Sequence, residues 1–188
     1  KAWNEQKEIR TVMLFLQTHG VSVGFAAKIF KQYGREAIKI VQENPYRLAA
    51  DIFGIGFITA DRIAEKLGLP KESLVRAEAG LLYVLNQLAE QGHVYVPEPL
   101  LIQEAMNILG IEAGLIAAAL ETLTAARTIA VENRGDTEPR AIYGLPFYLA
   151  ESQTASRLKA LIASPKQVRK IDADKALAWV QEQLAIAL

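Results

Sequence analysis

Two short glycine-centred segments are the part of this sequence whose residue types and spacing could bind a ligand. Gly20-Val21-Ser22 and Gly54-Ile55-Gly56 each stand between stretches of apolar residues at helical spacing. Glycine lets the chain reverse within a few residues, because it tolerates positive φ and close backbone approach. The helix that follows such a turn begins with backbone amides that have no partner, and these amides and the helix dipole attract an anion. The predicted chemistry is non-covalent binding of an anionic group.

The two segments belong to an internal repeat in which equivalent residues lie 34 positions apart. In each copy an alanine follows the turn, where a larger side chain would hold the two helices apart, and an isoleucine lies three residues further on the same helix face. A glycine then ends the second helix. The pairs are Gly20 and Gly54, Ala26 and Ala60, Ile29 and Ile63, and Gly34 and Gly68. Tetratricopeptide repeats share the period, but their aromatic pattern is missing and two copies would be too few.

Apolar residues before each turn predict the leading helix of each unit. Asn44-Pro45 opens the second of these helices, because asparagine can cap free amides and proline is tolerated at the first helical position. The expected apolar positions are Ile9, Val12, Met13 and Leu16 in the first copy and Tyr46, Leu48, Ala49 and Ile52 in the second. Each unit is therefore predicted as helix, tight turn, helix.

Charge is distributed unevenly along the chain. The formal net charge is zero, which argues against a protein that coats nucleic acid through bulk electrostatics. Residues 1–68 nevertheless hold 10 Lys and Arg against 7 Asp and Glu, whereas residues 69–188 hold 11 against 14. The cations near the turns are Lys28, Lys31, Arg62 and Lys66, and we expect Asp61 and Glu65 to neutralise part of the second pair. Contact with an acidic polymer is therefore expected in the first third of the chain.

The composition limits other functions. The 188 residues are 51% hydrophobic and 22% charged, which is typical of a globular protein. The absence of cysteine excludes a disulfide framework, Cys-ligated zinc and a thiol nucleophile, and two histidines argue against a metal cluster. No apolar stretch approaches the roughly 18 to 20 residues that cross a bilayer, and the first residues lack a signal-peptide pattern. We expect a cytoplasmic protein without membrane contact.

The second half of the chain has the pattern of a winged-helix-like module. A long helix is predicted from Ser73 to Gln91, ended by Gly92, and a short strand follows over His93 to Val96. The further predictions are helices over Glu98 to Ile108 and Glu112 to Ala126, and strands over Thr128 to Glu132 and Arg140 to Tyr143, joined by a polar turn. The helix from Glu112 carries no cation before Arg127, so we expect it to pack against protein and not to enter a DNA groove.

The last segment offers a helix from Ala150 to about Ser164, a linker over Pro165 to Lys170, and a final helix capped by Asp172. The predicted fold class is mainly α, with tandem helix-hairpin-helix units followed by a winged-helix-like module with a small β-hairpin. The predicted domains are 1–70, 71–164, and a linker and helix over 165–188.

Several strings resemble a known family. The glycine turns resemble the helix-hairpin-helix motif, in which such turns bind DNA phosphates through backbone amides without reading sequence. The strings Asn44-Pro45-Tyr46-Arg47-Leu48-Ala49 and Gly54-Ile55-Gly56-Phe57, continuing through Ala60-Asp61-Arg62-Ile63-Ala64, resemble the N-terminal region of RecD-like DNA helicases, as do Arg76-Ala77 and Gly92-His93. These helicases are relatives of the exodeoxyribonuclease V alpha subunit. The similarity covers most of the chain and is strongest from Gly20 to Pro97.

The resemblance implies a parent helicase that uses ATP to move 5′ to 3′ along single-stranded DNA in recombination and repair. No G-x-x-x-x-G-K-[ST] string occurs here, so this chain by itself is not expected to be an enzyme or to hold a cofactor. The resemblance also implies that the linker and helix over 165–188 lead to a missing ATPase core, where ATP and Mg²⁺ are expected. The implied partners are single-stranded or forked DNA, bound without sequence preference, and the helicase core of the same polypeptide. The expected DNA-binding residues are Gly20, Val21, Ser22, Lys28, Gly54, Ile55, Gly56, Thr59, Arg62 and Lys66.

Two other hypotheses stay open at this point. The hairpins could serve only packing, in a scaffold that docks on the helicase motor or on a partner protein without touching DNA. An enzyme of the helix-hairpin-helix glycosylase class would need a pocket with an activated Asp or Lys, and Asp61 lies in a helix that the motif already explains. Charge reversal at Lys28, Arg62 and Lys66 separates a DNA-binding region from a scaffold.

Overall fold

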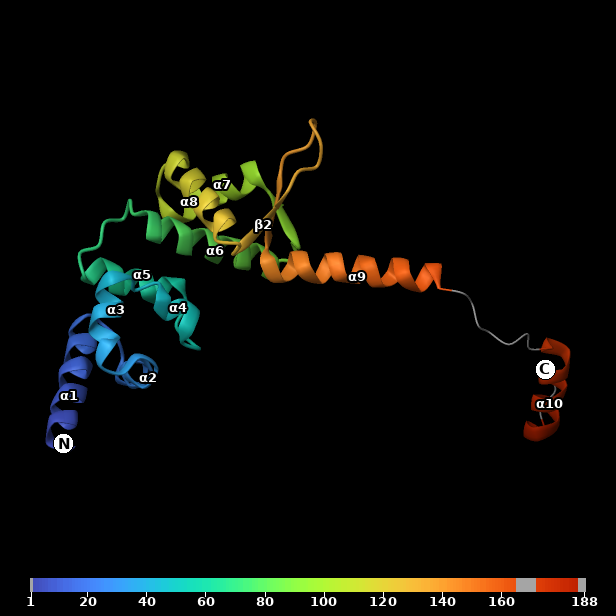
Figure 1. Ribbon diagram of the computed structural model, residues 1–188, viewed down its shortest axis with the longest axis horizontal. Helices are drawn as coiled ribbons and strands as arrows, with labels where there is room; N and C mark the ends of the chain where they lie inside the picture. Colours follow the sequence, from blue (N-terminus) through green and yellow to red (C-terminus); the bar gives the residue numbers. More distant parts are fainter. Residues whose placement is uncertain (1, 165–171, 186–188) are drawn as a thin grey trace. The chain divides into compact units, whose positions relative to one another are not determined.

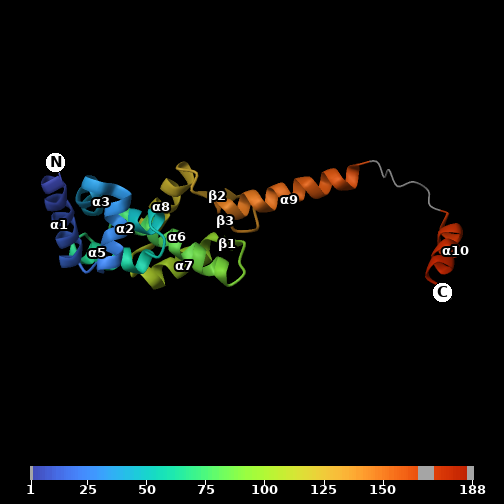
Figure 2. The same cartoon turned by 90° about the horizontal axis from the view of Figure 1, so that it is seen from below.

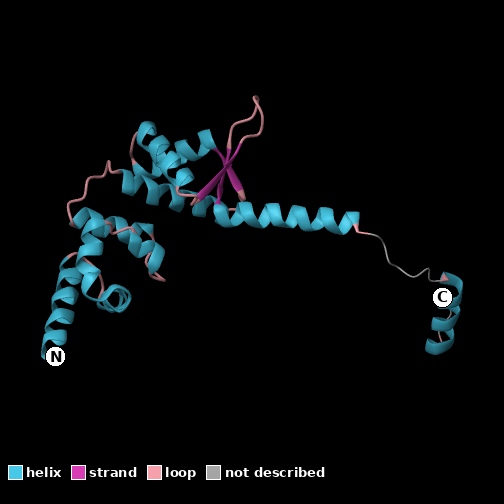
Figure 3. Ribbon diagram, in the orientation of Figure 1, coloured by secondary structure: helices cyan, strands magenta, loops and turns pink. Residues whose placement is uncertain are grey.

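The computed structural model describes residues 2–164 and 172–185, and the side chains from residue 6 onward. The chain divides into two units, Lys1–Ala150 and Glu151–Leu188. The first unit is mainly helical, with a small sheet that Figure 3 draws in magenta. Its elements up to the second hairpin are α1 (Ala2–Thr18), α2 (Val23–Tyr33), the 3-10 turn η1 (Gly34–Glu36), α3 (Ala37–Glu43), α4 (Arg47–Asp51) and α5 (Phe57–Lys66).

The repeat forms two helical hairpins, as the sequence predicts. The first is α1 and α2, and the second is the short α4 and α5. Helices α1, α2 and α3 pack together, as the views in Figures 1 and 2 both show. One apolar cluster joins the two hairpins; its members include Val12, Leu16, Val21, Ala26, Ile29, Val41, Leu48, Ile52, Ile55 and Ile63. The paired isoleucines of the repeat, Ile29 and Ile63, are therefore buried in one core.

Helix α3 connects the hairpins and was not predicted as a separate element. Gly34 ends α2 with a φ of +57°, as expected. The chain then turns through η1 into α3, whose Ala37 and Val41 are buried in the same cluster. Asn44 follows α3, and its Oδ1 accepts a hydrogen bond from the Tyr46 amide at 3.0 Å. Asn44 therefore holds the turn between α3 and α4. The prediction that Asn44 caps the second leading helix and that Pro45 is its first residue is wrong, because α4 begins at Arg47 and Asn44 ends α3.

A second apolar cluster forms the core between the remaining helices and the sheet of this unit. The elements are α6 (Leu74–Glu90), β1 (Tyr95–Pro97), α7 (Glu98–Leu109), α8 (Ala113–Ala125), β2 (Ile129–Glu132), β3 (Ala141–Gly144) and the start of α9 (Leu145–Ala163). The strands are antiparallel in the order β1-β3-β2, with Val96 opposite Ile142 and Ala130 opposite Tyr143. The order of elements predicted for this part is confirmed.

In this part of the chain, two predicted element starts differ from the structure by more than one residue. Strand β1 begins at Tyr95, two residues later than expected, and it includes Pro97. Proline is tolerated there because β1 is an edge strand. Helix α9 begins at Leu145 instead of Ala150, since Pro146 falls in the first helical turn, where no amide donor is needed.

The second unit contains α10 (Ala173–Leu184). Asp172 caps it as predicted, because its Oδ1 accepts a hydrogen bond from the Lys175 amide at 3.2 Å. The predicted linker over 165–170 lies outside the described residues. The proposed division into domains at residues 70 and 164 stays a prediction. Within the described ranges no single helix is long and apolar enough to cross a membrane; α7 and α8 reach that length and hydropathy only as a joined pair, bent by 116°.

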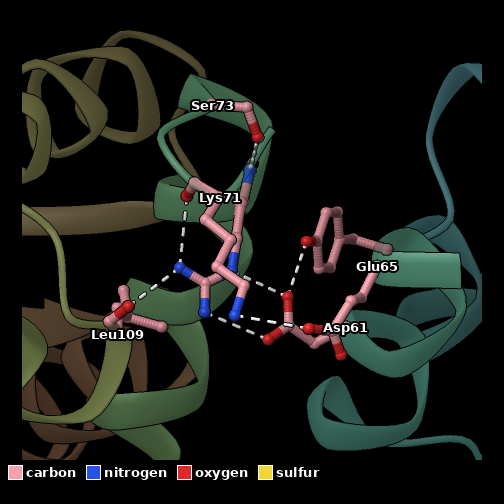
Figure 4. Close-up of polar contacts among 7 residues, drawn as sticks. Asp61, Glu65, Lys71, Ser73 and Leu109 are labelled. Atoms are coloured by element: carbon pink, nitrogen blue, oxygen red, sulfur yellow. Dashed lines mark hydrogen bonds and ion pairs between the residues drawn. The ribbon is translucent and has the colours of Figure 1, made fainter. Parts of the chain in front are cut away.

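A buried ion pair joins the second hairpin to α6 (Figure 4). Arg76 is 8% exposed, and its guanidinium donates to both carboxylate oxygens of Asp61, from Nε at 2.8 Å and from Nη2 at 3.1 Å. Its Nη1 also donates to the carbonyls of Lys71 and Leu109. Tyr46 donates to Asp61 at 2.7 Å. Arg76 thus links the second hairpin, the start of α6 and the end of α7.

The charged groups in this network shift one another's pKa values. Burial alone would raise the pKa of Asp61, but the hydrogen bonds from Arg76 and Tyr46 and the Arg76 charge outweigh burial and lower it. The hydrogen bond to Asp61 raises the pKa of Arg76. Close by, Phe57 stacks between Tyr46 and Tyr83, with ring centroids 5.8 and 5.1 Å away. Polar and aromatic contacts together fix α5 against α6.

We predict that Asp61→Asn destabilises the chain by about 2 to 4 kcal/mol at pH 7, because Arg76 then stays buried without its counter-charge. The folded pKa of Asp61 lies below its unfolded value of roughly 3.9, so the carboxylate stabilises the fold fully above about pH 5. That contribution is lost as the pH falls through 4 toward the folded pKa. Urea unfolding at pH 7 and pH 3 measures both effects.

The matched control is Glu65→Gln, because Glu65 pairs with Lys71 at 3.3 Å in an exposed position. This substitution is expected to cost less than about 1 kcal/mol. Equal losses for the two variants, or a loss for Asp61→Asn that does not shrink toward pH 3, would contradict the structural role of the Asp61–Arg76 pair.

Candidate nucleic-acid interface

The first turn is a glycine reversal that is anchored in the core. Gly20 has a φ of +82°, which explains the need for glycine. The Gly20 amide donates to Gln17 O and the Val21 amide to Leu16 O, both at 3.0 Å. The Val21 side chain is buried. Ser22 then caps α2, and its Oγ accepts from the Phe25 amide at 3.4 Å.

The second turn has the same plan. Gly54 has a φ of +95°, the Ile55 amide donates to Ile52 O at 3.1 Å, and the Ile55 side chain is buried. Gly56 takes the place of Ser22 as the N-cap of α5. In both turns the middle residue therefore points into the core, while the residues on either side of it are exposed.

The amides open to a ligand are shifted from those expected. Of the residues expected to bind DNA through their amides, Gly20, Val21 and Ile55 instead donate these amides within their own turns. The Thr59 amide donates to Gly56 O at 3.1 Å. Among the described residues of the two turns and of the helix starts that follow them, the amides without an acceptor are those of Ser22, Val23 and Gly24 in the first hairpin and of Phe53, Gly54, Gly56, Phe57 and Ile58 in the second.

Gly56 differs from the prediction. Its φ of −98° and ψ of 176° are open to any residue, so positive φ, one of the two expected reasons for a turn glycine, does not apply here. A Cβ built on Gly56 would meet nothing within 4 Å. The fold itself therefore does not require glycine at this position. An external group needs such open space to come close to the free amide of Gly56.

The two turns lie next to each other, because each receives a lysine from the other hairpin. Lys28 of α2 donates from Nζ to Phe53 O at 3.2 Å, and a Cβ built on Gly54 would lie 3.8 Å from the same nitrogen. In the opposite direction, a Cβ built on Gly20 would overlap the ammonium group of Lys66 at the end of α5. Lysines from both second helices thus cover one surface that contains both turns, which we call the paired-turn surface.

The nearby carboxylates do not neutralise these cations. Asp61 and Glu65 were expected to offset Arg62 and Lys66, but Asp61 pairs with Arg76 and Glu65 with Lys71. The carboxylates of α5 are thus neutralised by Lys71, just before α6, and by Arg76 in its first turn. In the part of the chain that the structure describes, Lys28, Arg62 and Lys66 have no carboxylate within ion-pair distance.

The structure separates the expected site residues into groups. It brings Gly20 and Lys66 together, and Gly54 and Lys28 together. Arg62 is exposed and lines a hollow with Ile58 and Arg76, and it is not shown to touch either turn. Thr59 is half-buried one turn into α5.

Sequence reasoning missed two features of this surface. The free amides of Val23 and Gly24 follow from the helix start at Val23, which could have been read from Ser22 as a capping residue. Phe53 is 96% exposed at the second turn. Its place in the apolar run Ile52-Phe53-Gly54-Ile55 predicts burial, so the sequence held no signal for its exposure.

Comparisons with known proteins agree with this geometry. Residues 5–95 match the family model described as the ATP-dependent RecD2 DNA helicase HHH domain. The chain is also 27% identical over 174 residues to the ATP-dependent RecD2 DNA helicase of Deinococcus radiodurans. That alignment covers 87% of this chain and 24% of the relative, so the chain spans about a quarter of the relative's length.

We predict unequal effects of alanine at the two glycines of the second turn. Gly54→Ala places a side chain at positive φ and is expected to cost about 1 to 2 kcal/mol of unfolding free energy. Gly56→Ala is expected to change stability by less than about 1 kcal/mol, because the weaker N-cap is offset by a less flexible unfolded chain. Urea unfolding of the two variants side by side makes the comparison. A larger loss at Gly56 would mean that this glycine serves the fold.

Proposed function

Since residues 5–95 of this chain are a helix-hairpin-helix domain of the RecD2 DNA helicase kind, we propose that the chain is an accessory region that holds DNA for a helicase without reading its sequence. The observation that carries this proposal is the paired-turn surface. It combines free amides at the starts of α2 and α5 with the ammonium groups of Lys28 and Lys66. Backbone amides and lysines bind phosphate oxygens, which every nucleotide carries.

The small number of cations beside the turns favours a contact with few phosphates. Two turns and a few cations suit about two to four phosphates, and the acidic balance of residues 69–188 does not extend the basic surface. Binding of this kind orients DNA and leaves movement to a motor. We propose that the whole protein acts in DNA recombination and repair, 5′ to 3′, in the cytoplasm.

The sequence has no ATP-binding loop. It lacks a glycine-rich loop ending in Gly-Lys-Ser or Gly-Lys-Thr, and among the described residues no cluster of three carboxylates or histidines could hold a metal ion. We therefore propose that ATP and Mg²⁺ bind in a helicase core outside this sequence. That core is also the expected partner of the chain within the same polypeptide.

The winged-helix-like part is proposed to be structural. Glu121 is the one charged residue of α8, so this helix offers no cation to a phosphate. The loop between β2 and β3 pairs Arg134 with Glu138, and Arg140 pairs with Glu98. This charge pattern also favours the second candidate function, a scaffold that docks on the motor or on a partner and does not touch DNA.

Neutralising the two lysines tests the proposal. In fluorescence anisotropy at low salt, Lys28→Gln with Lys66→Gln is expected to weaken DNA binding by about tenfold or more. The log-log salt slope, roughly −2 to −4 for the unmodified chain, should become shallower by about 2. Lys39→Gln, an exposed lysine on α3, is the control and should change neither quantity. If the chain is only a scaffold, the unmodified chain, the double variant and Lys39→Gln should have equal DNA affinity, or none of them should bind DNA.

Proline at Val23 removes one of the free amides. Val23 is 63% exposed at the first position of α2, and Ser22 before it has an extended ψ of 155°, so proline fits both positions. Val23→Pro is expected to lower DNA affinity about three- to tenfold, the net effect of one ordinary hydrogen bond, with unfolding free energy unchanged within about 0.5 kcal/mol. Val23→Ala keeps the amide and should bind normally. Equal affinities of the two variants would exclude this amide from the contact.

A further inference from the structure

A fully exposed aromatic ring stands at the edge of the paired-turn surface. Phe53 is 96% exposed, although Ile52 and Ile55 on either side of the same turn are buried in the shared core. A phenyl ring in water forgoes the burial that would favour folding. Neither α4 nor α5 includes Phe53, so the ring does not belong to an apolar helix face.

The backbone that carries this ring is fixed. Lys28 holds the Phe53 carbonyl from the neighbouring hairpin at 3.2 Å, and the Ile55 amide closes the turn onto Ile52 O. Gly54 adds the positive φ that turns the chain away after Phe53. The ring therefore projects from a rigid turn, and little backbone order is lost when it binds something.

The surroundings of the ring favour a nucleotide. The Lys28 ammonium lies beside the Phe53 carbonyl and also 5.5 Å from the Phe25 ring centroid. The free amide of Gly56 lies three residues along the chain, within about 11 Å. Exposed apolar side chains at the two helix starts, Val23 and Ile58, stand beside the free amides, so apolar and anion-binding groups share this surface as a nucleotide's base and phosphate would require. A phosphate on the amides places its own base, or the next one, within reach of the ring.

The first turn has no equivalent ring. The repeat offset places His19 at the position that corresponds to Phe53. His19 is half-buried, its Nδ1 lies 2.7 Å from Phe15 O, and its ring lies 4.4 Å from the Phe15 ring. The two turns can both hold phosphate, but only the second presents an unused aromatic face.

We propose that Phe53 stacks on an unpaired base, so that the paired-turn surface prefers single-stranded DNA or the single-stranded arm of a fork over duplex DNA. The proposal rests on the proposed function, because it needs the phosphate contacts beside the ring. A phenyl ring has no hydrogen-bonding group, so it stacks on every base alike and adds no sequence preference. Paired bases in a duplex already stack on one another and are closed to it.

The test uses the 188-residue chain and oligonucleotides that contain 2-aminopurine, whose fluorescence reports stacking. Phe53→Ala is expected to lower affinity for single-stranded and forked DNA about five- to thirtyfold, while duplex affinity changes less than about twofold. The 2-aminopurine signal on binding should disappear in Phe53→Ala and persist in Phe53→Trp. Leu14→Ala, which removes an exposed apolar side chain from α1, is the control.

An oligonucleotide with abasic sites provides the complementary measurement. It should bind the unmodified chain more weakly than the normal strand, and Phe53→Ala should not weaken it further. Equal losses on duplex and single strand, or no loss on any DNA, would overturn the stacking role and leave the ring for a protein contact. No DNA binding by the unmodified chain would instead overturn the proposed function, and the stacking role with it.

Discussion

The arrangement of this protein depends on one apolar core that two helical hairpins share. Val21 and Ile55, the middle residues of the two turns, are both buried in this core, and Ile29 and Ile63 from the two second helices join them. Because each turn is anchored by its middle residue, the residues on either side of it must face outward. The lysines that cross between the hairpins then cover the two turns from opposite directions. Hydrophobic packing thus sets the positions of amides that make no hydrogen bond within the protein.

Helix α5 belongs to both apolar cores of the first unit. Ile63 faces the core of the hairpins, whereas Phe57, Ala60 and Ala64 face the core of α6, α7 and α8. Ala60 is fully buried, which agrees with the small side chain expected after the turn. The Asp61–Arg76 pair then holds the orientation of α5 against α6. A buried ion pair of this kind is a weak source of net stability, but breaking it is costly, so it favours one arrangement over others.

Much of the fold follows from the sequence because its signals are local. Repeated glycines, capping residues and apolar spacing gave the hairpins, the long helix α6 and the order of strands. Helix α3 and the early start of α9 were missed, since a short connecting helix and a proline within a first helical turn carry weak local signals. The site was harder to predict. Which amides stay free depends on how each turn closes, and the pairing of Asp61 and Glu65 depends on Arg76 and Lys71, which only tertiary structure brings close. The exposure of Phe53 contradicts its apolar neighbours in sequence, so packing alone reveals it.

The most direct test of the account is a titration of the isotope-labelled chain with a short single-stranded oligonucleotide, followed through backbone amide chemical shifts. The account predicts that the largest changes cluster at Ser22 to Gly24 and at Gly54 to Ile58, with the buried amides of Val21 and Ile55 changing less. It also predicts small changes in α8 and in the loop between β2 and β3. Shifts concentrated in that loop or in α8, with both turns unaffected, would contradict the claim that the paired turns hold DNA.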